Sequence, residues 1–441
     1  MHAGVLLEMT KTLDFGQAVA EANRCLLCHD PPCSKGCPAG TDPGTFIRKL
    51  RMRNITGAIR TIKTNNILGG SCGILCPTCR LCEKECSATG IDRPIQIGQL
   101  QRFLVEHSYD IGFKVFPKQA PSGKKVAVVG SGPAGLSCAA ELAKAGFAVT
   151  IFEKLAEPGG VMRYGVPTHR FDGTLLTREI GDIKDLGVTI KCSSPLEGEA
   201  GAEKLLEQGF EAVFLAPGLW GPVSLREGQG AAKGVLSSVE FLKSRRENGA
   251  APDLLKGKAV AIIGGGSVAM DCAESALIMG ARDVYLVYRR SFTQMPAEDA
   301  EKINALASGI HFILLAQPLD YVTDGAGALK ALKIIRTRLG EPDASGRQKP
   351  VDIPGSEWLL EVDTCIEAIG QEPEKDSPLW YPSVKVSGKK LITADSATGK
   401  TSAKRIYAGG DVVRGPGLIV EAVNDGKTAA KAIIADLGSE V

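Results

Sequence analysis

The 441-residue chain has few aromatic residues, little net charge and no long apolar run at its N-terminus. Aromatic residues make up 5% of it and the formal net charge is +2, which gives no electrostatic basis for binding nucleic acid or an anionic membrane. The first apolar stretch spans only residues 5–7, far below the roughly 20 residues of a membrane span. We therefore expect a cytoplasmic protein with neither nucleic acid nor membrane as a partner.

Cysteine, in contrast, is abundant and concentrated. Nine of the thirteen cysteines lie in two groups, Cys25 to Cys37 and Cys72 to Cys86. Short loops that carry several thiolates are typical of iron–sulfur ligation, and disulfides are disfavoured where thiols stay reduced. The other four lie singly in the chain and are interpreted as small buried apolar residues: Cys138, Cys192, Cys272 and Cys365.

After the cysteine groups, the sequence pattern changes from one typical of helices and loops to one of alternating strands and helices. Buried strands are predicted over 126–129, 148–152, 259–263 and 283–288. The pattern predicts an α/β protein with an N-terminal α-helical iron–sulfur domain and two doubly wound, Rossmann-like domains. The stretch 340–357 is rich in Pro, Gly and Asp and is predicted to be a surface loop.

A glycine fingerprint for dinucleotides, Gly-Ser-Gly-Pro-Ala-Gly, follows the first predicted strand. Its glycines allow a tight turn, a close approach of the pyrophosphate and close packing of helix on strand. An acidic residue ends the next strand, where it would bind a ribose hydroxyl. The predicted contact residues are Gly130, Gly132, Pro133, Gly135 and Glu153.

A second fingerprint follows the strand at 259–263, and its predicted contact residues are Gly264, Gly266, Ser267 and Ala269. Arg289 and Arg290 stand after the next strand, where an NAD site would prefer an acidic residue. Arginines there suit a 2′-phosphate, which favours NADPH. The alternative is that both are solvated arginines beside an NADH site.

Two metal ions without redox chemistry would be hard to explain beside two redox nucleotides, which disfavours zinc as the occupant of the cysteine groups.

Two more glycine motifs, Gly159-Gly160 and Gly410-Asp411, resemble the FAD-binding parts of flavoproteins with two dinucleotide domains. The resemblance implies that the first fingerprint binds FAD and the second, with Gly370, binds the nicotinamide coenzyme. It also implies that the second domain is inserted in the first. We expect a helical double-cluster domain over 1–116, an FAD domain over 117–245 and 377–441, and an NAD(P)H domain over 246–376.

Taken together, the chain resembles the family that joins a double-cluster helical domain to such a flavoprotein. Members are the small subunit of bacterial glutamate synthase and the N-terminal half of dihydropyrimidine dehydrogenase. Within the family, the flavin subunits of bacterial dihydropyrimidine dehydrogenases are the most similar. The segments that carry this resemblance are 24–30, 37–39, 41–44, 46–48, 76–78, 97–98 and 100–103.

The resemblance also implies the cluster ligands. It assigns Cys25, Cys28, Cys33 and Cys86 to one [4Fe–4S] cluster, and Cys37, Cys76, Cys82 and Gln101 to the other. Glutamate synthase small subunits carry glutamate at the position of Gln101. Spacing alone favours a different set, because Cys76, Cys79, Cys82 and Cys86 form a ferredoxin-like run.

The expected function is an NAD(P)-dependent oxidoreductase that oxidises NADPH or NADH at FAD and passes electrons through two [4Fe–4S] clusters. The resemblance implies an FMN-containing partner, the catalytic subunit of a dihydropyrimidine dehydrogenase, that reduces uracil or thymine to the 5,6-dihydropyrimidine. No general acid or base is assigned in this chain, because the cofactors carry the chemistry. The alternatives are a glutamate synthase small subunit, a related electron-transfer subunit, or a non-catalytic scaffold that holds clusters.

Overall fold

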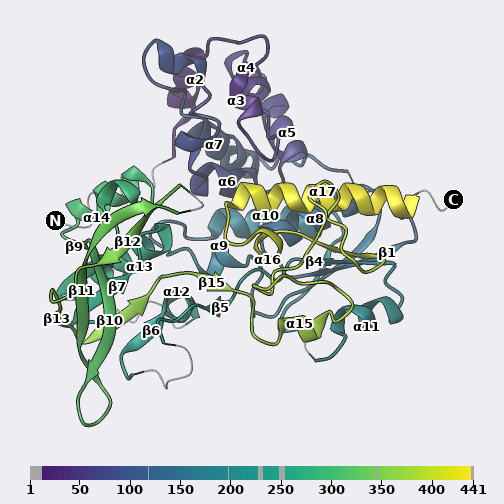
Figure 1. The fold of residues 1–441 in the computed structure, drawn as a ribbon. Coiled ribbons are helices and arrows are strands. Elements are labelled where there is room, and N and C mark those ends of the chain that lie inside the picture. Colours follow the sequence, from purple (N-terminus) through teal and green to yellow (C-terminus); the bar gives the residue numbers. More distant parts are fainter. Residues whose placement is uncertain are drawn as a thin grey trace.

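The computed structural model describes residues 12–117, 119–196, 198–226, 232–247, 254–343 and 346–438. A helical unit lies on one side of the long C-terminal helix α17 (Ile419–Gly438), and a parallel sheet lies on the other (Figure 1). A second parallel sheet, with an antiparallel sheet beside it, forms the remaining part of the molecule. No helix in these ranges is long and apolar enough to cross a membrane.

The helical unit is built from short helices, some of which begin at a residue whose side chain caps the helix. Asp14 and Gln17 form a capping box at the first helix, and Asp42, followed by Pro43, accepts a hydrogen bond from the backbone N–H of Thr45. The helices are α2 (Phe15–Asn23), α3 (Pro32–Lys35), α4 (Pro43–Arg51), α5 (Ile55–Asn65), α6 (Gly69–Leu75) and α7 (Ile97–Asp110). Two 3-10 turns, η1 (Thr78–Arg80) and η2 (Ser87–Gly90), lie between α6 and α7.

The first parallel sheet has the strand order β16-β4-β1-β2-β3. Its strands are β1 (Lys125–Val129), β2 (Ala148–Phe152), β3 (Thr189–Lys191), β4 (Ala212–Leu215) and β16 (Ile406–Ala408). The helices of this unit are α8 (Pro133–Lys144), α9 (Val161–Tyr164), α10 (Thr174–Asp185), α11 (Gly201–Glu207), α15 (Ser377–Trp380), α16 (Asp411–Arg414) and α17. Helices α8 and α17 pack closely, because Gly426 brings α17 against the backbone of α8.

The second parallel sheet has the order β6-β14-β7-β8-β9. Its strands are β6 (Val235–Ser237), β7 (Ala259–Ile263), β8 (Asp283–Tyr288), β9 (His311–Leu314) and β14 (Thr364–Glu367), with α12 (Ser238–Glu247), α13 (Ser267–Ile278), α14 (Asp299–Ala307) and η3 (Phe292–Gln294). All of it lies between β4 and β16 in the chain, which confirms the predicted insertion. Strand β6 joins this sheet ahead of residue 246, where we expected the NAD(P)H domain to begin; the boundaries stay predictions.

Two further sheets contain only antiparallel pairs. In one, the order is β10-β11-β12, and β13 pairs with β11. Its strands are β10 (Ala316–Thr323), β11 (Leu329–Pro342), β12 (Gln348–Asp352) and β13 (Trp358–Glu361). The other is a two-stranded ribbon of β5 (Gly221–Pro222) and β15 (Gln371–Glu372), which stands where the chain passes between the two parallel-sheet units.

The prediction of a surface loop over 340–357 is wrong for much of that range. Strand β11 continues to Pro342, and β12 pairs with it in antiparallel register, with Leu339 opposite Pro350. Proline is tolerated at an edge strand, where its missing N–H faces away from the ladder. Composition therefore misled the prediction, because a hairpin at the edge of a sheet can carry the residues of a loop.

Helix α10 of the first sheet unit holds the helical unit through two acidic residues, of which Asp182 is partly buried and Glu179 is buried. Asp182 accepts from Lys63 Nζ at 2.8 Å and from the Tyr109 hydroxyl at 2.9 Å. Glu179, which is fully buried, accepts from the backbone N–H of Gly70 at 2.7 Å and from Ser71. Glu179 thus supplies acceptors for the first N–H groups of α6, which have no partner within that helix.

Candidate cofactor sites

A cavity of about 280 Å³ lies at the carboxyl ends of the strands of the first sheet. Clefts at this edge of a parallel sheet are where dinucleotides bind. The structure brings together there most of the residues predicted for the FAD site: Gly130, Gly132, Pro133, Glu153, Gly160, Gly410 and Asp411. Gly135 and Gly159 do not line the cavity.

The glycines of the first fingerprint are required by close backbone contacts. A Cβ on Gly135 would lie 2.0 Å from the carbonyl oxygen of Gly130, and one on Gly130 would lie 2.3 Å from that of Ala216. Gly132 differs, because a Cβ there would meet no atom within 4 Å and the residue faces the cavity at the N-terminus of α8. This open space at a helix N-terminus suits a pyrophosphate.

Glu153 ends β2 and fastens the fingerprint loop. Its carboxylate accepts from the Ser131 backbone N–H at 2.9 Å, from the Ser131 hydroxyl and from the Leu155 N–H at 2.8 Å. The Ser131 hydroxyl in turn accepts from the N–H of Gly159 at 3.1 Å. The two glycine motifs predicted for FAD are therefore joined through one serine that sequence analysis did not single out.

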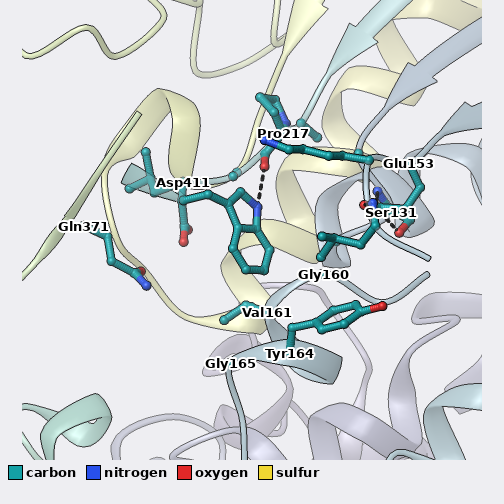
Figure 2. A pocket seen from close by; sticks show the side chains of 18 of the residues that line it. Ser131, Glu153, Gly160, Val161, Tyr164, Gly165, Pro217, Gln371 and Asp411 are labelled. Carbon is teal, nitrogen blue, oxygen red and sulfur yellow. Dashed lines mark hydrogen bonds between the residues drawn. The ribbon is translucent and has the colours of Figure 1, made fainter. Parts of the chain in front are cut away.

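Asp411 faces the cavity from the side opposite Ser131 and Glu153 (Figure 2). Burial raises the pKa of its carboxyl to about 6, although a backbone hydrogen bond from Gly417 and the charge of Arg414 oppose the rise. A carboxyl held at the start of α16 and aimed into the cavity can accept hydrogen bonds from ligand hydroxyls.

Other residues of the cavity wall were not predicted. Tyr164 and Gln371 line it on further sides (Figure 2), and the indole of Trp220 donates to the carbonyl of Pro217 at 3.0 Å. Gln371 belongs to the ribbon β5–β15, and Val268 comes from the first turn of α13. Trp220 and Gln371 come from segments without a motif, so no local signal could have found them, whereas Tyr164 and Val268 lie beside or within the glycine motifs.

The second fingerprint forms the turn between β7 and α13, with Gly264 at φ +146° and Ser267 and Ala269 in the helix. Its Gly265 carbonyl accepts from Ala297, and Pro296 lies 3.7 Å from the Cβ position of Gly266. Val268, between Ser267 and Ala269, reaches the cavity of the first fingerprint. Gly370, at φ +140°, lies just before β15. Of the second fingerprint, only Val268 meets this cavity; the predicted contact residues do not line it: Gly264, Gly266, Ser267 and Ala269.

The two arginines after β8 have different surroundings. Arg289 is exposed, whereas Arg290 is buried with 7% of its surface exposed. The Arg290 Nε donates to the carbonyl of Gln348 in β12 at 2.7 Å, and its guanidinium lies 3.5 Å from the carboxylate of Asp343. Arg290 therefore fastens the β11–β12 hairpin to the end of β8, and only Arg289 presents its guanidinium to solvent.

The thiols of the helical unit fall into two groups, the first of which we call the Cys25 group. Its members line a small cavity of about 20 Å³ between α3, α4 and η2: Cys25, Cys28, Cys33 and Cys86. Burial and the neighbouring Cys86, Cys25 and Cys28 raise the pKa of Cys33 to about 11. Four thiolates would repel one another at this site, and the iron ions of a cluster would remove that repulsion.

The second set, the Cys37 group, comprises Cys37, Cys72, Cys76 and Cys82. A hydrogen bond with Cys72, burial and the charges of Cys72, Cys37 and Cys82 raise the pKa of Cys76 well above its usual range. Cys72 was given no role from the sequence, although it lies in α6 one turn before Cys76, the C-cap residue whose N–H donates to the Cys72 carbonyl. Gln101 lies on α7, where its amide donates to the Gly69 carbonyl at the start of α6.

Cys79 stands apart from both groups. It is exposed, and its thiol lies 3.6 Å from a carboxylate oxygen of Glu298, at the start of α14. No three His, Cys, Asp or Glu side chains within the described ranges converge closely enough to hold a single metal ion. Of the four scattered cysteines, Cys138, Cys272 and Cys365 are buried as predicted, whereas Cys192 is only partly buried; all thirteen are free thiols.

Two family descriptions together cover nearly the whole chain. Residues 4–112 match dihydropyrimidine dehydrogenase domain II, 4Fe-4S cluster, and residues 124–426 match pyridine nucleotide-disulphide oxidoreductase. These matches show that the chain is an oxidoreductase whose cofactors are [4Fe–4S] centres, FAD and NAD(P)H, as predicted. The residues described above fit these cofactors.

Three curated relatives show how far the similarity extends. The NAD-dependent dihydropyrimidine dehydrogenase subunit PreT of Escherichia coli strain K12 is 35% identical over 97% of this chain and 96% of that protein. The glutamate synthase (NADPH) small chain of the same strain is 32% identical over 97% and 93%. The NADP(+)-dependent formate dehydrogenase subunit beta of Moorella thermoacetica is 36% identical over 91% of this chain, which spans only 59% of that protein's length.

Solved structures resemble the two sheet units. Mycobacterium tuberculosis FprA in complex with NADPH has a TM-score of 0.59 and 21% identity, covering 72% of this chain and 85% of that chain. T. acidophilum thioredoxin reductase has a TM-score of 0.52 and 21% identity, covering 71% and 99%. At this identity the likeness concerns the fold alone. From the family matches and the full-length relatives, the chain belongs to the family of pyridine nucleotide oxidoreductases with an N-terminal [4Fe–4S] domain that includes PreT-type dihydropyrimidine dehydrogenase subunits and glutamate synthase small chains.

Proposed function

We propose that this chain is the electron-input subunit of a dihydropyrimidine dehydrogenase. It oxidises NAD(P)H at FAD and passes electrons through two [4Fe–4S] clusters to an FMN-containing partner. The partner adds two electrons and two protons across the C5=C6 bond of uracil or thymine. The bound flavin supplies the conversion of a two-electron hydride into single electrons.

The observation that carries this proposal is that one helix, α17, reaches from the cavity to the loop of Cys37. Ala422 of α17 lines the cavity, and Lys427 of the same helix donates to the carbonyl of Ala39, two residues after Cys37. Five helical residues rise by about 7.5 Å. A flavin in the cavity and a cluster at the Cys37 group would therefore be near neighbours, as single-electron transfer requires.

The residue roles are part of the proposal. FAD is assigned to the predicted residues that line the cavity, Glu153 among them, together with Gly135 and Gly159. The nicotinamide coenzyme is assigned to Gly264, Gly266, Ser267, Ala269, Gly370 and Arg289. Arg290 supports Arg289. One cluster is assigned to the Cys25 group, and the other to Cys37, Cys76, Cys82 and Gln101. The glutamine at position 101, and the relatives named PreT, support a pyrimidine-reducing partner over a glutamate synthase partner.

The isolated, anaerobically purified chain should oxidise NADPH or NADH with an artificial acceptor and should not reduce uracil. Its two parallel-sheet units are both used by FAD and NAD(P)H, and the second flavin belongs to the partner. The measurement is coenzyme oxidation followed at the same enzyme concentration with dye, with uracil and with neither. Uracil reduction by this chain alone would contradict the division of labour, and no dye reduction by the cofactor-loaded chain would favour the scaffold.

Coenzyme choice should depend on Arg289. A 2′-phosphate bonded to its guanidinium gains roughly 1.5–3 kcal/mol, so Arg289→Ala should lower kcat/KM for NADPH about tenfold or more and leave that for NADH nearly unchanged. Arg338→Ala, at an exposed arginine of β11, is the matched control. Arg290→Ala should weaken both coenzymes alike, because Arg290 holds the hairpin. Equal use of both coenzymes by the unaltered chain and by Arg289→Ala would exclude a phosphate contact there.

A further inference from the structure

Lys427 is a cation of the FAD unit that is inserted into the helical unit. It lies in the middle of α17, and its Nζ donates to the carbonyls of Ala39 at 2.5 Å and Asn65 at 2.6 Å. Both acceptors are neutral, and Lys427 forms no salt bridge among the described residues. Glu141, the carboxylate whose charge acts on Lys427, is bonded to Lys144 at 2.5 Å. Lys427 is therefore held between the two units by neutral acceptors, with no carboxylate bonded to it among the described residues.

The side of Lys427 that faces the helical unit meets the loop of Cys37. Ala39 belongs to the segment Cys37–Thr41, in which the Thr41 N–H donates to Cys37 Sγ at 3.4 Å and the Thr41 hydroxyl lies 3.3 Å from it. Burial lowers the pKa of Lys427, while the charges of Glu141 and Cys37 act in the opposite direction. Of the two thiol groups, the Cys37 group is the one whose loop this ammonium touches.

An electron added at the Cys37 group adds one negative charge to a site that is largely removed from water. The reduction potential of an iron–sulfur cluster depends on nearby net charge, hydrogen bonds and solvent exposure. A fixed ammonium acts strongly here because a partly buried charge is screened less by salt than an exposed one. Its place between the cavity and Cys37 favours electron flow from the flavin toward this cluster.

We propose that Lys427 raises the electron affinity of the cluster at the Cys37 group and so directs electrons to it from the flavin. The inference rests on the proposed function, in which FAD and this cluster exchange electrons. It assigns Lys427 an electrostatic effect on one cluster only, in addition to its hydrogen bonds to Ala39 and Asn65.

The test is an anaerobic redox titration of the full, cofactor-loaded chain, followed by electron paramagnetic resonance. Lys427→Gln keeps N–H donors for the two carbonyls but removes the charge. It should lower the electron affinity of one cluster about tenfold or more, which is about 59 mV for a one-electron couple. The other cluster and the iron content should not change. Lys427→Arg, which keeps the charge, should stay within about threefold of the unaltered chain.

Lys431→Met is the matched control, since it removes an exposed positive charge one turn further along α17 and should leave both potentials unchanged. An unchanged potential in Lys427→Gln with full iron content would overturn the inference. Loss of iron in Lys427→Gln would also overturn it, because Lys427 would then be structural. Clusters that dithionite reduces but neither coenzyme does would contradict the proposed function, while the Lys427 shift would still be measured.

Discussion

Replacing Cys86 with alanine should remove one cluster, reducing the iron content from about eight to about four per chain, because a missing thiolate takes one ligand from a four-ligand centre. Cys82→Ala should have the same effect on the other cluster. Cys79→Ala should retain all the iron, since Cys79 is exposed and contacts Glu298 rather than other thiols. Iron analysis, together with electron paramagnetic resonance of the reduced protein, measures the loss or retention of clusters in the three variants.

Cys79→Ala is thus the matched control for the two ligand variants. A loss of iron in Cys79→Ala would favour the ferredoxin-like run that spacing alone suggests. The fourth ligand of the Cys37 group has its own comparison. If Gln101→Ala loses this cluster and Cys72→Ala does not, the family assignment is correct; the opposite result would make Cys72 the ligand, in agreement with its contact to Cys76.

The stability of the protein should fall as pH rises from 5 to 8 because of Glu179. Burial raises the pKa of this carboxyl from 4.5 to about 7, although its hydrogen bonds from Ser71 and Gly70 oppose the rise. A raised folded-state pKa means that the folded protein binds the proton more tightly, so stability is full below the unfolded pKa and is lost as pH rises through 7. A shift of this size corresponds to about 3 kcal/mol.

In Glu179→Gln the side chain at this position cannot titrate. From pH 5 to pH 8 the stability of this variant should therefore fall by about 3 kcal/mol less than that of the unaltered chain. Unfolding midpoints of the anaerobic holoprotein, measured from pH 5 to pH 8, give the two slopes. Glu207→Gln, at an exposed glutamate of α11, should keep the unaltered slope. Parallel pH profiles for Glu179→Gln and the unaltered chain would mean that Glu179 stays charged, or stays protonated, throughout this range.

Local patterns predicted the parts of the fold whose causes are local. The strands at 126–129 and 148–152 are fully contained in β1 and β2, and the strands at 259–263 and 283–288 are β7 and β8. The glycine fingerprints were recognisable because tight turns and close packing leave no room for other residues. The start of α4 at Asp42 and Pro43 also has a local cause, since an N-cap and a first-turn proline act within a few residues.

The remaining features depend on contacts between distant segments. Arg290 lies beside Arg289 in the sequence, yet it is buried because a hairpin more than fifty residues later packs on it. Glu179 looks like an ordinary helical glutamate until α10 meets the start of α6. No pattern in the sequence marks the segments that come together in these places.

The inserted topology has a consequence for how the chain folds as it is synthesised. Strand β16 pairs with β4, although almost 200 residues separate them, and α17 with its close contact to α8 comes later still. Such long-range pairing is slow to form. The helical unit and the second sheet can each fold from residues already made, but the first sheet keeps an open edge at β4 until the C-terminus has emerged. Gly410 and Asp411, which line the cavity, follow β16, so the FAD binding proposed there would have to wait for this pairing. A chain truncated before β16 would expose an aggregation-prone strand edge at β4.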